Sequence, residues 1–400
     1  MTTPDTARRT FIKQMTGTTA GDARRTFKVG VIGTGGRSRG AMDNLRDNMP
    51  FSLFIVAIAL IATTSLAKAE QQIEQPPHVT FQYSQVTGIG EEPGVTRRDP
   101  SDVIRVGETY YVYYSKVVLS DVPGEYRRLY PSGYIATLWY ATSEDVGHTW
   151  TEGGEALGVG DEGSFDDFAI FTPTILFHDG RYWLYYTAVQ APFEDRLITQ
   201  QRLNDPTAIG VAVADSPDGP FRRISNDPVV VPGTEEDDFD SYRVDDARML
   251  IRDGKVWLYY KGRSLIHGSG GPRRTQMGVA IADNPQGPFT KANEGRPVQD
   301  SGHEVQIWRY GQGVLSLVSN TGPNGRTLQY APDGLGFEVL VRNLERQPAA
   351  PGLYRPELTD PTAAIDLQNA WGISMGRRSS DVFLQRFEME IPEQLLPSIE

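Results

Sequence analysis

The chain has 400 residues, no cysteine and a formal net charge of −12 at pH 7. The missing cysteines exclude disulfides, thiolate metal sites and cysteine nucleophiles. Residues 1–69 carry ten basic and four acidic side chains, so residues 70–400 carry 29 basic and 47 acidic ones. Binding nucleic acid through its phosphates requires a basic face. We therefore expect that the protein has no nucleic-acid partner and that residues 70–400 suit neutral or cationic small molecules.

The first 48 residues contain two targeting-like or fold-like signals, and both are incomplete. Arg8–Lys13 resembles a twin-arginine export signal, but no apolar stretch follows it. The stretch VGVIGTGGRSRGAMDNL (29–45) resembles the opening of a dinucleotide-binding oxidoreductase, with glycines that let backbone approach a pyrophosphate. Its sixth motif position is Ser38, and no second strand with a ribose-binding acid follows. We interpret 1–48 as an upstream fragment, from a misplaced start or a fusion, without cofactor function.

Residues 49–69 predict a secretory signal peptide. The chain carries no charge from Pro50 to Ala67, and Ala67-Lys68-Ala69 supplies the small-x-small pattern of a cleavage site. An apolar run of this length could also anchor the chain in a membrane. We expect a periplasmic or secreted protein without stable membrane association once the signal is cleaved.

Beyond residue 78 the sequence repeats one plan. The stretches 98–116, 171–189 and 244–262 each have a polar start, an apolar strand, a glycine turn and an aromatic-rich strand, and 302–320 is a looser copy. Each continues into a third strand and a second turn, as in AIGVAVADSPDGPF (208–221). A degenerate fifth unit is expected from Tyr354 to about Ile391. HVTFQYSQV (78–86) could supply a missing strand that ties the ends of a ring.

Five four-stranded units with almost no helical periodicity predict an all-β fold, a five-bladed β-propeller over residues 78–392. A long β-sandwich is the competing interpretation. In a propeller the first strand of each blade lines the central channel, so equivalent starting positions converge on one pocket.

Alignment of the glycine turns makes four starting positions equivalent: Asp99, Thr172, Asp246 and Glu304, with His303 next to Glu304. Three acids and a histidine at one axial funnel suit glycoside hydrolysis, in which one carboxylate activates water and a second group protonates the leaving oxygen. Trp139 follows a long insertion (117–135) and is a candidate platform for sugar stacking. Arg98 is a further candidate substrate contact.

The motifs RRDPSDVI, FTPTILFHDGRYWLYY, IGVAVADSPDGPF, MGVAIADNPQGPF, SGHEV and TLQYAPDGLGFEVL resemble glycoside hydrolase family 117. The resemblance covers roughly residues 90–390. It implies a five-bladed propeller and an exo-acting 3,6-anhydro-α-L-galactosidase that acts on neoagaro-oligosaccharides. The related family 43 propellers share the three-acid layout without the GHEV element.

The resemblance also implies roles for individual residues. Asp99 matches the general base of an inverting displacement, and Asp246 matches the acid that orients and tunes the site. His303 matches an unusual general acid that Glu304 supports, and Thr172 matches a substrate contact. Histidine suits this role because its unperturbed pKa near 6.5 lets it hold a proton in mildly acidic to neutral solution.

The chain departs from the family pattern at three places. The third-blade motif usually has His before the Asp and Pro after it, whereas this chain reads Asp245-Asp246-Ala247-Arg248. Thr187 stands where a polar amide is expected. The N-terminal helical segment through which the family forms homodimers is missing, so the sequence leaves the oligomeric state open.

Several alternatives stay open at this point. One is an arabinofuranosidase- or xylosidase-type propeller glycosidase, and another is a sugar-binding propeller without catalysis. A nicotinamide-dependent oxidoreductase is a third, resting on residues 29–40 alone. No cofactor is required by the glycosidase interpretation, although axial carboxylates could hold a calcium or magnesium ion.

Overall fold

The structure is a computed structural model that describes residues 76–190, 207–267, 273–319, 321–378 and 381–398. The chain divides into two units, Met1–Pro76 and Pro77–Glu400, and only the second is described below. The upstream fragment (1–48) and the signal peptide (49–69) expected from the sequence lie outside the described residues. Within the described ranges, no helix is long and apolar enough to cross a membrane.

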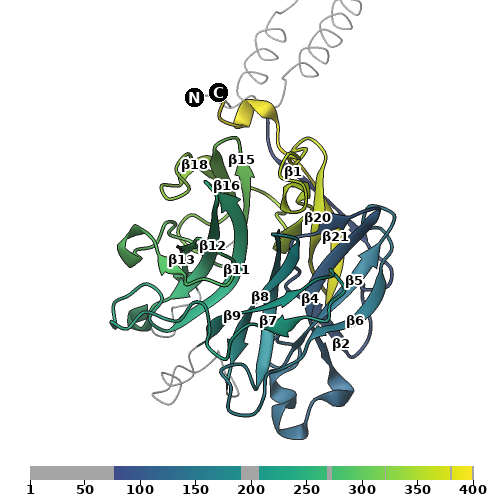
Figure 1. Cartoon of the computed structure of the whole chain (residues 1–400). Helices are drawn as coiled ribbons and strands as arrows, with labels where there is room; N and C mark the ends of the chain where they lie inside the picture. The colour runs from purple at the N-terminus through teal and green to yellow at the C-terminus, as the bar shows by residue number, and fades with distance from the viewer. Residues whose placement is uncertain (1–75, 191–206, 268–272, 320, 379–380, 399–400) are drawn as a thin grey trace, which may run out of the picture. The chain divides into compact units, whose positions relative to one another are not determined.

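Five antiparallel sheets make up the second unit, and each is one blade of a five-bladed β-propeller (Figure 1). In blades 1 to 4 the strands follow one another in sequence, from the inner strand outward. Blade 1 contains β2 (Val95–Arg98), β4 (Thr109–Val118), β5 (Thr137–Ser143) and β6 (Thr151–Leu157), with the short β3 (Ile104–Val106) paired to β4. Blade 2 contains β7 (Ala169–His178), β8 (Arg181–Val189), β9 (Ala208–Ala214) and β10 (Arg222–Arg223).

Blades 3 and 4 repeat the same order. Blade 3 contains β11 (Arg243–Arg252), β12 (Lys255–Arg263), β13 (Gln276–Ala282) and β14 (Thr290–Lys291). Blade 4 contains β15 (Gln306–Tyr310), β16 (Gly313–Val318), β17 (Thr327–Ala331) and β18 (Glu338–Arg342). The described helical segments are short 3₁₀ turns, η1 (Leu119–Asp121), η2 (Gly124–Leu129), η5 (Asn293–Gly295), η6 (Pro356–Leu358) and η7 (Glu393–Leu395).

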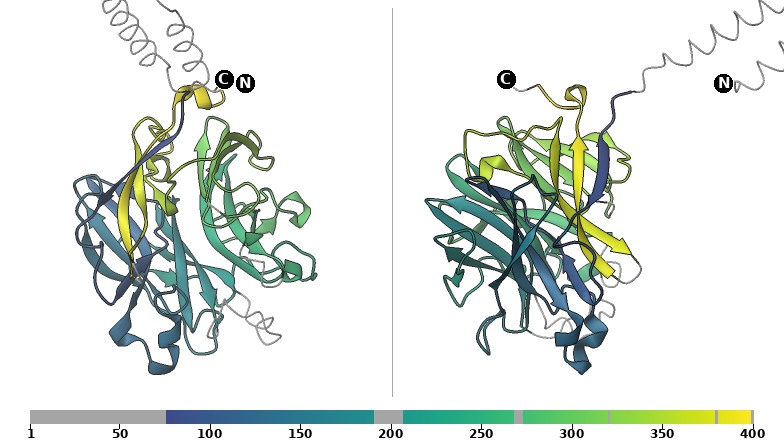
Figure 2. Two further views of the ribbon diagram at one scale, coloured as in Figure 1. Left: turned by 180° about the vertical axis from the view of Figure 1, so that it is seen from behind. Right: turned by 90° about the vertical axis from the view of Figure 1, so that its right-hand side faces the viewer.

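Blade 5 closes the ring with strands from both ends of the unit. It contains β19 (Ala349–Leu353), β20 (Ala370–Arg378) and β21 (Asp381–Glu390), and β1 (Thr80–Gln85) pairs with β21 as its outer strand (Figure 2). The predicted closing strand at 78–86 is therefore confirmed. The expected start of the fifth unit at Tyr354 was wrong, because its inner strand β19 ends before that residue. AAPGL has neither alternation nor a polar start, so it gives little strand signal.

Pairs of consecutive tyrosines in the second strands join neighbouring blades. Successive strand residues point to opposite faces, so the two rings of each pair have different partners. The first tyrosine of each pair donates a hydrogen bond to a turn carbonyl of the next blade. The donor and acceptor residues are Tyr113 with Pro217, Tyr185 with Pro285 (2.6 Å) and Tyr259 with Gly334 (2.8 Å). The second tyrosines donate to buried or half-buried carboxylates: Tyr114 to Glu152, Tyr186 to Asp166 and Tyr260 to Asp240.

A buried ion pair links blades 1 and 5 near the axis. Arg355 Nη1 donates to Asp102 Oδ2 and to the carbonyl of Met249, each at 2.9 Å. The backbone N–H of Leu353 and the amide of Gln306 donate to Asp102 Oδ1 at 3.0 and 2.6 Å. Arg355 and Asp102 are both fully buried, so this network connects blades 1, 3, 4 and 5 away from solvent.

Replacing Arg355 with methionine is expected to lower the free energy of unfolding by about 3 kcal/mol, because it leaves the Asp102 carboxylate buried without a cation. Urea unfolding followed by tryptophan fluorescence measures the change. Arg309→Met, at an exposed position, is the control. The double variant with Asp102→Asn should recover part of the loss, and an equal loss in both variants would contradict the explanation.

Candidate active site

In each blade one residue with left-handed backbone lies within or next to the inner strand, at the same place. The φ angles are 51° at Asp99, 47° at Thr172, 51° at Asp246, 53° at Glu304 and 42° at Ala350. A β-branched residue such as Thr172 adopts such an angle only when its surroundings impose it. In blades 2, 3 and 5 the inner pairing shifts register at these residues, as a bulge does. In these three blades the bulge changes the direction of the side chain at the same position.

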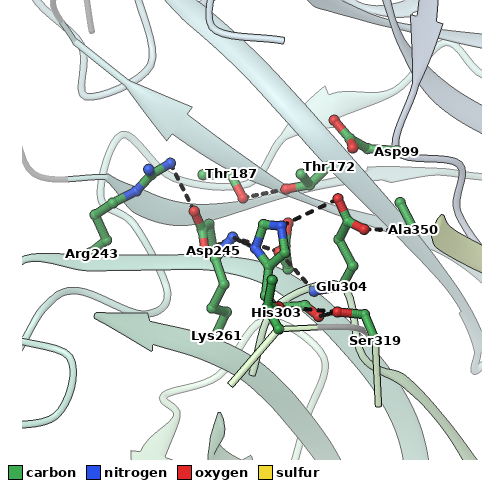
Figure 3. Close-up of polar contacts among 12 residues, drawn as sticks. Asp99, Thr172, Thr187, Arg243, Asp245, Lys261, His303, Glu304, Ser319 and Ala350 are labelled. Atoms are coloured by element: carbon green, nitrogen blue, oxygen red, sulfur yellow. Dashed lines mark hydrogen bonds and ion pairs between the residues drawn. The ribbon is translucent and has the colours of Figure 1, made fainter. Parts of the chain in front are cut away.

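The equivalence of Asp99, Thr172, Asp246 and Glu304 predicted from the sequence is thus confirmed by the backbone. The fifth member, Ala350, was missed because its strand was missed and because alanine carries no chemistry. It contributes a backbone group instead, since its N–H donates to Glu304 Oε2 at 3.0 Å (Figure 3). Blade 5 therefore holds one oxygen of the blade 4 carboxylate.

Asp99 lies at the end of β2 and is paired with the residue before it. Arg98 Nε donates to Asp99 Oδ2 at 2.7 Å. Burial raises the pKa of Asp99 above its usual range, the charges of Asp246 and Glu304 add to this effect, and Arg98 opposes it. Asp99 is therefore a carboxylate of increased basicity, which is the property that a general base needs.

Asp246 lies on β11 and is held as a carboxylate. Its Oδ2 accepts a hydrogen bond of 2.6 Å from Lys261 Nζ and one of 3.4 Å from the backbone N–H of Glu304. Burial alone would raise the pKa of Asp246, but the charges of Lys261 and His303 outweigh it and hold that pKa below the usual range. Asp246 thus contributes a fixed negative charge beside the histidine.

His303 and Glu304 form a pair at the start of blade 4. His303 Nε2 lies 3.4 Å from Glu304 Oε1, and the carbonyl of His303 accepts a 2.6 Å hydrogen bond from Ser319 Oγ. Burial and Lys261 lower the pKa of His303, whereas Glu304 and Asp246 raise it, and the net result is a raised pKa. The pKa of Glu304 is lowered, because His303 outweighs the effect of burial. The ring is therefore protonated to higher pH than a free imidazole.

The stretch Asp245-Asp246-Ala247-Arg248 of blade 3, which departs from the family pattern, is held by ion pairs and by a hydrogen bond to blade 5. Asp245 is buried and lies 2.9 Å from Lys261 Nζ and 2.8 Å from Arg243 Nη2. Arg248 extends to blade 5, where its Nη2 donates to the carbonyl of Pro351 at 3.0 Å. The extra acid is thus neutralised by cations of its own blade, and Asp246 keeps its place on the bulge.

Lys261 is the functional residue that sequence reasoning missed. At the end of KVWLYYKGR it reads as a solvated strand end. Register supplies the overlooked signal, because Lys261 stands directly opposite Asp245 on the neighbouring strand, and opposite charges at such positions attract. The structure places its ammonium group between two carboxylates and the ring of His303 (Figure 3).

Blade 2 contributes a neutral hydroxyl pair to the site. Thr172 Oγ1 and Thr187 Oγ1 are hydrogen-bonded to each other, and both side chains are buried. The backbone N–H of Thr172 donates to Ser115 Oγ of blade 1 at 3.0 Å. Thr187 therefore supports Thr172 in the position where the family pattern has an amide.

Trp139 lies on β5, which β4 separates from the inner strand β2. Its ring centroid is 3.6 Å from Lys116 Nζ, and its Nε1 donates to Thr137 Oγ1 at 3.0 Å. No described contact joins Trp139 to the axial residues above, and its role as a sugar platform stays a prediction.

Other residues of the blade 1 insertion come closer to the axial group. A Cβ added to Gly133 would lie 3.3 Å from Arg98 Cδ and 3.4 Å from Asp99 Oδ2. The neighbouring Tyr134 packs edge-on against Phe171, and the Arg243 guanidinium lies 5.5 Å from its ring centroid. Gly133 and Tyr134 therefore form a wall beside Asp99.

The sequence left open whether the axial carboxylates hold a divalent cation. Among the described residues, no group of three or more His, Asp and Glu side chains has the geometry to hold a metal ion. Next to Asp245 and Asp246 it is the Lys261 ammonium that supplies the positive charge.

Comparison with known proteins identifies the relatives of this propeller. The chain superposes with a TM-score of 0.67 and 30% sequence identity on Zg3597, a family 117 glycoside hydrolase produced by the marine bacterium Zobellia galactanivorans. The match covers 80% of this chain and 93% of that one. The chain belongs to glycoside hydrolase family 117. It is therefore a glycoside hydrolase by family and by fold, with an oligosaccharide as its class of substrate.

This chain also resembles other propeller hydrolases. The profile described as "Glycosyl hydrolases family 43" matches residues 94–270. An endo-arabinase from Bacteroides thetaiotaomicron has the same fold, with a TM-score of 0.50 and 13% identity over 78% of this chain and 99% of that one. No curated protein sequence matches the chain significantly.

Proposed function

We propose that this family 117 member is an exported, inverting exo-glycosidase that releases 3,6-anhydro-L-galactose from neoagaro-oligosaccharides or acts on a related galactan fragment. The observation that carries the proposal is that one axis holds both a carboxylate able to accept a proton and an imidazole that is favoured in its protonated form. Asp99, on blade 1, is a buried carboxylate of raised pKa, and His303, on blade 4, is an imidazole whose proton Glu304 and Asp246 favour.

These two groups suit a single displacement. In the proposed step a water oxygen bonds to the anomeric carbon while its proton passes to Asp99. The bond from that carbon to the leaving oxygen breaks, and the imidazolium of His303 gives a proton to that oxygen. Asp246 and Glu304 carry the negative charge that keeps His303 protonated beforehand. The net charge of the site is the same before and after the step, because Asp99 gains one proton and His303 loses one, and no covalent intermediate is needed.

Export is part of the same proposal and rests on the uncharged run from Pro50 to Ala67 followed by Ala67-Lys68-Ala69. Mass spectrometry of the chain recovered from the periplasm or medium of an expressing bacterium tests it. A mature N-terminus just after Ala69 supports export and cleavage. An intact Met1 on the recovered chain contradicts cleavage, and a chain found only inside the cell contradicts export.

A second candidate is an arabinofuranosidase- or xylosidase-type activity. The family 43 profile over residues 94–270 favours it, because this region contains Asp99, Thr172 and Asp246. Both candidates use the same axial acids, so they differ in the sugar and not in the class of reaction.

The purified chain, incubated with neoagarobiose, longer neoagaro-oligosaccharides, arabino- and xylo-oligosaccharides and aryl glycosides, distinguishes these candidates. Chromatography identifies the released sugar, and NMR of the first product identifies its anomer. Release of anhydrogalactose with inverted configuration is the expected result. Release of arabinose or xylose alone would favour the second candidate. Binding of a sugar without turnover of any would replace both with a non-catalytic propeller.

A further inference from the structure

The position of Lys261 recurs in all five blades. It is the second-strand residue that faces the residue before the left-handed one: Ser115 faces Arg98, Thr187 faces Phe171, Lys261 faces Asp245 and Met375 faces Ala349. In blade 4 the corresponding Ser319 donates its hydroxyl to the carbonyl of His303. Three of these residues carry a short hydroxyl and one is methionine. Lys261 is the charged member of the five, and the one long enough to reach the histidine of the next blade.

Three acceptor atoms surround the Lys261 ammonium nitrogen. Asp246 Oδ2 lies at 2.6 Å, Asp245 Oδ1 at 2.9 Å and His303 Nδ1 at 3.3 Å. The Lys261 side chain is 8% exposed, so water can replace few of these contacts. Burial lowers the pKa of Lys261, but the two aspartates raise it more, and the net pKa is above its usual value. An ammonium group has three protons and no lone pair, so each acceptor matches one proton.

We propose that Lys261 is a positioning residue for His303, whose ammonium group donates to Nδ1 and thereby fixes the neutral ring as the Nε2–H tautomer. A donor-only group can hydrogen-bond Nδ1 only through that atom's lone pair. The remaining ring proton then sits on Nε2, which lies 3.4 Å from Glu304 Oε1. The tautomer is set by the hydrogen bond at the other nitrogen.

The same contact controls how readily His303 gives up a proton. Three charged groups face the ring: Lys261 from β12, Asp246 from β11 and Glu304 next in the chain. The two carboxylates favour the imidazolium, whereas Lys261 repels it and stabilises the neutral ring through Nδ1. Without the lysine, His303 holds its proton to higher pH and is a weaker acid.

Nitrogen-15 NMR of the full chain, labelled at histidine, tests the tautomer directly. The five histidines are distinguished by the signal that His303→Gln removes. At a pH where His303 is neutral, we expect Nδ1 to show the chemical shift of a bare ring nitrogen and Nε2 that of a protonated one. A neutral His303 protonated on Nδ1 would overturn the proposal, whatever the catalytic activity is.

Substitution then tests the cause. Lys261→Met is expected to mix the two tautomers and to move the titration of His303 to higher pH, whereas Glu304→Gln should move it to lower pH. Lys255→Met is the matched control, because Lys255 is exposed and ion-paired with Asp283. Where the single variant does not fold, the double variant Asp245→Asn/Lys261→Met removes the buried pair together. An unchanged tautomer and titration in these variants would refute the role of Lys261.

The kinetic consequence rests on the proposed function and is separable from the NMR result. With a substrate found by the panel above, Lys261→Met should lower kcat about 10-fold, change KM little and move the basic limb of the pH profile upward. Lys261→Arg keeps the charge and should restore part of kcat. A shifted NMR titration with no shift in the pH profile would retain the positioning role and remove His303 as the general acid.

Discussion

Replacing Asp99 with asparagine is expected to lower kcat by about 10²–10⁴-fold, the usual contribution of a positioned general base. Asparagine has the same shape and tolerates the left-handed backbone of this position, so the fold should persist. The neutral amide cannot take the proton of the attacking water. The measurement is kcat on the sugar identified by the substrate panel, together with the thermal unfolding midpoint.

Asp253→Asn is a closely matched control for this variant. Asp253 also has left-handed backbone, at φ 52°, and it also follows an arginine that contacts it, with Arg252 Nε at 3.3 Å. It lies in the turn between β11 and β12, at the opposite end of β11 from Asp246, and is 76% exposed. Activity close to wild type is expected for it. Azide, a nucleophile that needs no deprotonation, should restore turnover to Asp99→Asn. A fully active Asp99→Asn protein would remove Asp99 from the mechanism.

The repeated hairpins made most of the fold predictable. Each of the first three blades carries its full pattern of apolar strand, glycine turn and tyrosine-rich strand, and the pattern also predicts which positions are equivalent. Asp99, Thr172 and Asp246 follow from this alignment alone, and their shared left-handed backbone confirms it. Local sequence and blade geometry agree in these hairpins, which is the condition for reading a fold from a sequence.

The parts that could not be predicted depend on contacts between blades. The sequence AAPGL has no local signal of an inner strand. It becomes one because β20 and residues of blade 1 provide its backbone hydrogen bonds. The backbone N–H of Ala350 contacts Glu304 only after the ring has formed. Lys261 looks like a surface residue until Asp245 and the His303 ring enclose it. The sequence therefore predicts well which residues lie at the axis. It predicts less well the charge state of each one there, because that depends on contacts between blades.

Replacing His303 with glutamine is expected to lower kcat by about 10²–10⁴-fold on a natural sugar leaving group. Glutamine keeps a polar side chain at this position, but its amide has no acidic proton to transfer to the leaving oxygen. The loss should be much smaller on an aryl glycoside whose phenol leaves without protonation. That contrast separates a general acid from a residue that only binds sugar, because lost binding would reduce both substrates alike.

The pH profile of the same variant gives a second, independent test. In the wild type, kcat/KM should fall at low pH as Asp99 takes a proton, and at high pH as His303 loses one. Both pKa values are raised, that of Asp99 by burial and that of His303 by Glu304 and Asp246 against burial and Lys261. The optimum therefore lies between an acidic limb above the ordinary aspartate range and a basic limb above that of a free histidine. His303→Gln should abolish the basic limb and keep the acidic one.

His178→Gln provides the matched control for this substitution. His178 also stands before an acid, with Nε2 3.5 Å from Asp179 Oδ2, but it is the last residue of β7, at the opposite end of that strand from Thr172. The two histidines thus share a similar local pair and differ in their surroundings. A basic limb that persists in His303→Gln, or that disappears in His178→Gln, would show that the axial ring is not the proton donor. Loss of the limb in His303→Gln alone would mean that the axial surroundings of this histidine, Lys261, Asp246 and Glu304, make it an acid.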